Sequence, residues 1–253
     1  MDIHKPKPWH GWREFLKEYG IIVLGVLTAL GAEQLVESAH WAHRVAETRT
    51  QLNIELAADA RNGLQWLSNA RCLDAELAAL NNALAQARRT GTFHAPVQPY
   101  TPWLDKFSSD AWLNARSLQV SDHMSADEVA RYSNVYFYPT ELVGNITTLH
   151  NQAGELAPLA HDLDHMSPTE ADDLAARIGR IQELQTRTEL AITLMIAGAE
   201  TAGATVRPPP AESAEGPRAC VTDPAVLLKA LHSKHNGSRD LFAKLGLTFF
   251  PGQ

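Results

Sequence analysis

The hydrophobic positions of the first third of the chain follow a helical period. From residue 35 to residue 84, apolar side chains recur at spacings that are mostly sums of threes and fours. This is the pattern of an amphipathic helix, close to a heptad repeat. Between residues 32 and 90 there is no proline, and Gly63 is the single glycine. The pattern predicts one long helix from about residue 11 to about residue 89, capped by Gly91.

Proline-rich segments divide the rest of the chain. Three prolines between residues 91 and 102 predict a loop, and a short helix is expected over residues 102–118. The apolar side of that helix would consist of Trp103, Phe107, Trp112 and Leu113. A second proline-rich stretch, residues 205–218, is expected to be an extended linker. The pair Asp223-Pro224 then predicts the start of a last short helix.

Two further helices have clear start signals. Ser125 and Glu128 have the spacing of a capping box. Ser167 followed by Pro168 is typical of a helix N-terminus. Pro139 is expected to kink the first of these helices or to divide it. The predicted fold class is all-α, with an N-terminal membrane helix that continues into a long helix and packs with an extramembrane helical bundle.

The N-terminal part of the long helix contains an uncharged run, residues 19–32. Its 14 residues would measure roughly 21 Å as a helix, whereas a bilayer core of about 30 Å needs about 20 residues. The flanks lengthen the apolar surface in both directions, and the ammonium group of Lys17 can reach the headgroups. We therefore expect residues 15–36 to span a membrane, with tilt or bilayer thinning covering the mismatch.

Aromatic and basic residues indicate the orientation of this span. The residues expected at the membrane interface are Trp9, Trp12, Lys17 and Tyr19. Four basic residues precede the apolar run and two follow it closely, which places the N-terminus in the cytoplasm. The expected organisation is a cytoplasmic tail (1–18), a transmembrane segment (15–36), a periplasmic helical domain (37–204), the proline-rich linker (205–218) and a C-terminal helical tail (219–253).

Three alternatives compete with a membrane span. A cleaved signal peptide would find a passable cleavage site at Ala29-Leu30-Gly31, but the helical pattern continues through it without a turn residue. A buried helix of a soluble domain is the second alternative. A monotopic anchor is the third, and it is disfavoured because the apolar residues occupy all faces of the helix instead of one stripe.

One face of the apolar segment consists of small side chains: Gly25, Thr28, Ala29 and Ala32. Small residues let two helix backbones approach closely in lipid. The sequence therefore predicts a membrane helix contact face. Glu33 follows at the end of the run, where we expect it at the wet interface.

The net charge limits the classes of partner that the chain can have, and the cysteine content limits the kinds of site that it can form. The net charge of −7 and the lack of a basic stripe with interleaved aromatic residues exclude a nucleic-acid partner. The two cysteines, Cys72 and Cys220, are far apart and have no metal-binding spacing. They are either free thiols or, in an oxidising compartment, a disulfide that ties the C-terminal segment to the long helix.

Candidate chemistry is sparse. Three histidine pairs have helix-face spacing: His40 and His43, His161 and His165, and His232 and His235. Only the pair His161 and His165 has carboxylates beside it, and a closed zinc site needs about four ligands, so it is a weak metal candidate. No catalytic residue and no cofactor are predicted. Six aromatic residues, Trp103, Trp112, Tyr132, Tyr136, Phe137 and Tyr138, either line a pocket or form core.

Two segments of the sequence resemble a known group of proteins. Residues 20–37 (GIIVLGVLTALGAEQLVE) and residues 110–136 (DAWLNARSLQVSDHMSADEVARYSNVY) resemble a widespread group of uncharacterised bacterial single-pass membrane proteins. Their recurring form is a charged tail, a short apolar segment of the GIxVLGVLIALxxEQ kind and a coiled helix. Thr28 stands where an aliphatic residue is usual. The resemblance implies a helical protein anchored in the bacterial inner membrane, and it implies no particular activity.

These features favour a non-enzymatic accessory or scaffold protein. Its partners would be the lipid bilayer and another membrane protein or a second copy of the chain. A cytoplasmic tail of about 18 residues is too short for a catalytic signalling module, so the chain would act through contacts in the membrane or outside it. The alternatives are a periplasmic ligand-binding or sensing module with an aromatic-lined pocket, and a metal enzyme that uses His161 and His165.

Overall fold

The computed structural model describes residues 11–96, 100, 102, 106–209 and 220–233. In chain order its elements are α1 (Trp12–Thr90), α2 (Asp110–Ser117), η1 (Val120–His123), α3 (Ala126–Gly154), η2 (Ala157–Ala160), α4 (Pro168–Ala202) and α5 (Pro224–His232). The described residues contain no strand, apart from an isolated bridge between Phe93 and Leu163. The all-α prediction is confirmed.

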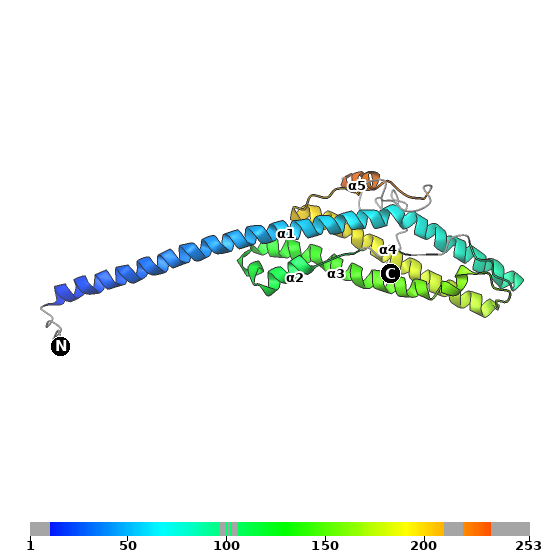
Figure 1. The fold of residues 1–253 in the computed structure, drawn as a ribbon, viewed down its shortest axis with the longest axis horizontal. Helices are drawn as coiled ribbons and strands as arrows, with labels where there is room; N and C mark the ends of the chain where they lie inside the picture. The colour runs from blue at the N-terminus through cyan, green and yellow to red at the C-terminus, as the bar shows by residue number, and fades with distance from the viewer. Residues whose placement is uncertain (1–10, 97–99, 101, 103–105, 210–219, 234–253) are drawn as a thin grey trace, which may run out of the picture.

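α1 is a single helix of 79 residues. At about 1.5 Å per residue it is roughly 118 Å long. It ends at Gly91, whose φ of 78° is left-handed and whose N–H donates to the carbonyl of Ala87. Its first third extends alone from the molecule, and the remainder lies in a bundle with the later helices (Figure 1). The later helices therefore fold back along the distal part of α1.

The core of the bundle forms where α4 packs along both α1 and α3. α1 contributes the heptad-spaced side chains Val45, Leu52, Leu56, Leu64, Leu67, Leu77 and Leu84, all buried. α3 and α4 contribute Leu142, Ile146, Leu149, Ile178, Ile181, Ile192 and Met195. Gly63 marks a close approach of α1 to α4, because a Cβ there would lie 2.7 Å from Cγ2 of Ile192.

The helix starts follow their predicted caps. Ser125 and Glu128 form a complete capping box at α3. The side chain of Ser167 accepts a hydrogen bond from the N–H of Glu170, with Pro168 at the first position of α4. The side chain of Asp223 accepts one from Ala225 at α5. Each cap satisfies a backbone donor that the helix itself leaves unpaired.

Two helix predictions need correction. The helix expected over residues 102–118 begins only at Asp110, and Leu113 is 53% exposed instead of facing the core. Two carboxylates of α1 accept hydrogen bonds from the backbone and the side chain of Ser108. These contacts fix the start of α2 at Asp110. α3 continues through Pro139 as one helix, so of the two outcomes expected for this proline the division does not occur.

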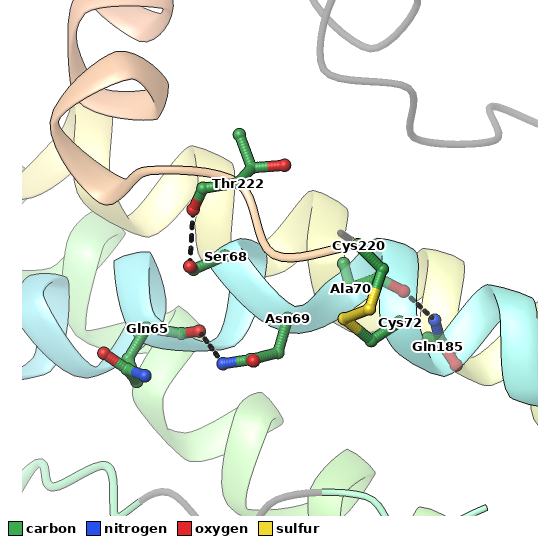
Figure 2. Close-up of a disulfide and its surroundings, with 8 residues drawn as sticks. All are labelled: Gln65, Ser68, Asn69, Ala70, Cys72, Gln185, Cys220 and Thr222. Carbon is green, nitrogen blue, oxygen red and sulfur yellow. Dashed lines mark hydrogen bonds between the residues drawn. A yellow bond between two sulfur atoms is a disulfide. The ribbon is translucent and has the colours of Figure 1, made fainter. Parts of the chain in front are cut away.

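The C-terminal described segment is tied to the middle of α1. Cys72 and Cys220 form a disulfide across 148 residues of sequence. Beside it, Ser68 Oγ donates to the carbonyl of Thr222 at 2.5 Å, and the Thr222 N–H donates back to the carbonyl of Ser68 at 2.9 Å (Figure 2). The sequence did not decide between free thiols and a disulfide, and in the structure the two cysteines are bonded to each other. α5 follows with Leu227 buried against the bundle.

Candidate functional site: the apolar segment of α1 and the base of the bundle

The apolar segment of α1 makes no core contact. Eight of its large side chains are more than half exposed: Ile21, Ile22, Leu24, Val26, Leu27, Leu30, Leu35 and Val36. Within the described part of the chain, α1 is the one helix long and apolar enough to cross a membrane. The best window has a mean hydropathy of 1.7, and none of it is buried inside the molecule. Leaving such side chains in water costs about 1.5–3 kcal/mol each.

The predicted contact face is open. Gly25, Ala29 and Ala32 are exposed, and nothing lies within 4 Å of a Cβ built at Gly25. The hydroxyl of Thr28 donates to the carbonyl of Leu24 at 2.8 Å, so it is satisfied within the helix. Because successive residues turn by roughly 100°, these small residues lie on the side of α1 roughly opposite Val45, which packs into the bundle. The predicted contact face and the bundle therefore lie on opposite sides of α1.

The predicted interfacial residues are placed at the start of α1. Trp12 is 74% exposed and Tyr19 is 56% exposed. Phe15 lies between them, with ring centroids 5.8 Å from Trp12 and 6.0 Å from Tyr19. Lys17 is exposed on the same turns of the helix. Trp9 lies outside the described residues.

α1 meets the bundle first at Trp41. Its ring stacks on that of His123 in η1, with centroids 3.7 Å apart and planes at 14°. The guanidinium carbon of Arg44 lies 5.6 Å from the centroid of the Trp41 ring, within cation–π range. These contacts hold the turn before α3 against α1, five residues beyond Val36.

An ion pair reinforces this junction. Arg49 Nε lies 2.7 Å from Glu128 Oε1, and Nη2 donates to Oε2 at 3.0 Å. Glu128 also accepts hydrogen bonds from the N–H and hydroxyl of Ser125. The hydrogen bond from Arg49 is the main reason that the pKa of Glu128 lies below its usual value. The capping box of α3 is thereby tied to α1.

Two hollows open beside the junction. One encloses about 700 Å³ between Glu37, Trp41 and Val45 of α1 and His123 of η1. The other encloses about 720 Å³ on the neighbouring side of α1, where α2 comes close. Both are lined by polar and charged side chains as well as apolar ones, so they are surface hollows of a mixed character and not part of the apolar core.

Two carboxylates of α1 hold the start of α2. Glu55 accepts hydrogen bonds from the hydroxyl of Ser108 at 2.8 Å and from the N–H of Ala111 at 3.1 Å. Asp59, one turn further, accepts from the N–H of Ser108 at 3.2 Å. Burial raises the pKa of Asp59 to about 8, the hydrogen bond from Ser108 opposes this, and the charge of Glu55 adds to it.

Of the described aromatic residues, Trp112, Tyr132 and Tyr136 are buried in the core, whereas Phe137 is 57% exposed. The ring of Trp112 stacks on Tyr136 at 6.0 Å and 15°, and lies 6.0 Å from Tyr132. The hydroxyl of Tyr136 donates to the carbonyl of Leu52, and that of Tyr132 donates to Oδ1 of Asn53. These rings fill the space between α1, α2 and α3 and line neither of the two hollows. Trp103 lies outside the described residues.

A second buried polar group lies further along the bundle. Gln185 Nε2 donates to Oδ1 of Asp74 at 3.0 Å and to Oε1 of Glu189 at 3.2 Å, and it also lies 3.4 Å from the carbonyl of Ala70. Burial raises the pKa of Glu189 to about 8, and the charge of Asp74 adds to this shift. The hydroxyl of Tyr100 donates to Oε1 of Gln185. The arrangement joins α1 to α4.

The described histidines do not gather into a metal site, and His235 lies outside the described residues. His161 and His165 lie in the non-helical connection between η2 and α4, so they do not share a helix face as their spacing predicted. Asp162, between them, accepts instead from the backbone N–H of Ala95 and pairs with His94. Across the described residues, no group of three or more His, Cys, Asp or Glu side chains is placed to hold a metal ion.

Comparison with protein families, with curated proteins and with solved structures finds no match to this chain. The resemblance to bacterial single-pass membrane proteins therefore stays a prediction from the two segments that carry it.

Proposed function

We propose that this chain is a non-enzymatic accessory or scaffold protein of a bacterial inner membrane. In this proposal, residues 15–36 cross the bilayer with the N-terminus in the cytoplasm, and the bundle lies in the periplasm. The observation that supports it is the continuity of α1. One uninterrupted helix carries an apolar segment exposed on all sides and then forms part of the bundle core.

The disulfide supports the proposal that the bundle lies on the periplasmic side of the membrane. Disulfides form and persist in oxidising compartments such as the bacterial periplasm and are rare in the cytosol. The bond between Cys72 and Cys220 lies in the bundle, on the far side of the apolar segment from the N-terminus. The excess of basic residues before the apolar run favours the same orientation.

The contact face supports action through helix pairing. It continues past the apolar segment as exposed residues at alternating spacings of four and three: Val36, Ala39, His43, Ala46 and Thr50. This is heptad spacing, and the line runs on the side of α1 opposite the bundle. A partner helix, from another membrane protein or from a second copy, can therefore lie along α1 as far as Ala46. Thr50 already lines the hollow beside α2.

Crosslinking of single cysteines tests the contact face. The two native cysteines are bonded to each other, so an introduced thiol is the free one. Ala29→Cys lies on the contact face, and Leu27→Cys lies on the opposite side of the same helix turn. In native membranes under mild oxidation, we expect Ala29→Cys to give a crosslinked product and Leu27→Cys to give little. Equal crosslinking at both positions contradicts the proposed face, and no crosslinking at either position contradicts pairing with a second copy.

A further inference from the structure

The hollow between Glu37, Trp41 and His123 has a defined height above the membrane. Val36 is the last large exposed apolar residue of the membrane segment. Trp41 follows it by about 7.5 Å along the helix axis. The headgroup layer on each side of a bilayer is roughly 5–7 Å thick. If α1 crosses the membrane, the lower wall of the hollow lies within the headgroup layer and the base of the bundle covers it from above.

The charged side chains that line the hollow determine which charge a bound ligand should carry. Arg49 contributes to the wall, but its charge is paired with Glu128 at 2.7 Å. Glu37 has no ion-pair partner in the described part of the chain, and its carboxylate is exposed. The rim of the hollow nearest the membrane is therefore negative. A cationic group is attracted by this carboxylate, while the ring of Trp41, already stacked on His123, forms an apolar wall beside it.

The upper wall retains one donor. The contact with Glu128 uses Nε and Nη2 of Arg49 and leaves Nη1 to donate to another acceptor. A ligand with an ammonium group and a phosphate would match both ends, with the ammonium at Glu37 and a phosphate oxygen toward Arg49. Phospholipid headgroups are the molecules with that pair of charges which the headgroup layer itself supplies.

We propose that this hollow binds the headgroup of a phospholipid with a primary ammonium group, through the carboxylate of Glu37 and the guanidinium of Arg49. A primary ammonium donates hydrogen bonds to a carboxylate, whereas a quaternary ammonium has no N–H to donate. The site should therefore favour an ethanolamine headgroup over a choline headgroup. This inference rests on the proposed membrane span.

The test uses the full chain in vesicles that contain equal parts of phosphatidylethanolamine, phosphatidylcholine and phosphatidylglycerol with identical acyl chains. After mild solubilisation, native mass spectrometry counts the lipids that remain bound. We expect the ethanolamine lipid to be retained roughly fivefold over the choline lipid, the order for one partly exposed charged contact. Glu37→Gln should remove the preference. Glu47→Gln, on the same helix but outside this hollow, should leave it unchanged.

Flotation of the vesicles is measured first, because it tests the membrane span separately from the binding of the headgroup. A chain that does not float with the vesicles overturns the membrane span and this inference together. A chain that floats but retains the ethanolamine and choline lipids equally overturns the inference alone. Retention of the glycerol lipid in preference, or an ethanolamine preference that survives Glu37→Gln, overturns it as well.

Discussion

Two buried carboxyl groups, Asp59 and Glu189, make the interior of the bundle sensitive to pH. Burial raises the pKa of each to about 8 in the folded chain, from ordinary values near 4. An acid whose pKa is raised by folding stabilises the protein fully below its unfolded pKa and loses that contribution as the pH rises through the folded value. The bundle should therefore lose stability between about pH 4 and pH 8.

Glu189→Gln tests this at one residue. The amide cannot ionise and keeps an oxygen that accepts from Gln185, so the variant should be little changed at pH 5 and more stable than the natural chain at pH 8. The gain at pH 8 should be on the order of 3 kcal/mol, an upper range set by a shift of several pKa units in a buried group. Urea unfolding of both proteins at the two pH values measures it. An equal difference at both pH values contradicts the assignment.

Neither carboxyl group was predicted from the sequence as part of a site. Asp59 and Glu189 lie among apolar residues of α1 and α4, where the helical pattern alone would place them in the core or at its edge. Asp59 accepts a hydrogen bond from Ser108, which is 49 residues away. Glu189 accepts one from Gln185 of the same helix, and the like charge that acts on it belongs to Asp74, which is 115 residues away. Only the packing of the helices brings them together, so the residues could be recognised but their pairing could not.

At the scale of elements, α2 depends on a cap supplied by another helix. Glu55 accepts from Ala111 and from Ser108, at separations of 56 and 53 residues. A carboxylate near a helix N-terminus satisfies free N–H groups and interacts favourably with the helix dipole. The sequence predicted a longer helix because Phe107 is apolar and could continue the pattern. The carboxylates of α1 instead hold the backbone before Asp110 outside the helix.

Glu55→Ala should loosen α2 while leaving α1 and α4 intact. We expect a loss of about 1–2 kcal/mol, the usual cost of removing a capping side chain. Hydrogen exchange should show faster exchange of the amides in residues 111–117 and unchanged protection in α4. Glu47→Ala is the matched control, since its exposed carboxylate pairs only with His43 within α1. A uniform rise of exchange across the bundle would contradict a local capping role.

The ends of most elements could be predicted because their signals are local. Gly91, the capping box at Ser125 and the Ser167-Pro168 start each act within four residues, and the structure confirms all three. The stack of Trp41 on His123 could not be predicted, since it depends on where η1 meets α1. The hollow at the base of the bundle depends on the same contact and was missed for the same reason.

At the scale of the whole molecule, one helix joins the apolar segment to the bundle core. Its length followed from the near-absence of glycine and proline, and the structure confirms it from Trp12 to Thr90. Which side of α1 carries the bundle is set by Trp41, Val45 and Leu52, which share one face. The proposed contact face around Ala29 lies roughly opposite that side, so the proposal allows a partner helix to bind there while the bundle stays free.

The central claim is that α1 crosses a bilayer and carries the bundle on the far side. Labelling of single cysteines with a membrane-impermeant maleimide in spheroplasts tests it most directly, because the native cysteines are bonded to each other. We predict that Ala85→Cys, at an exposed position of α1 in the bundle, is labelled from outside, Lys7→Cys only after lysis, and Leu27→Cys only after solubilisation. Labelling of Lys7→Cys and Ala85→Cys from the same side, or labelling of Leu27→Cys in intact spheroplasts, would contradict the account.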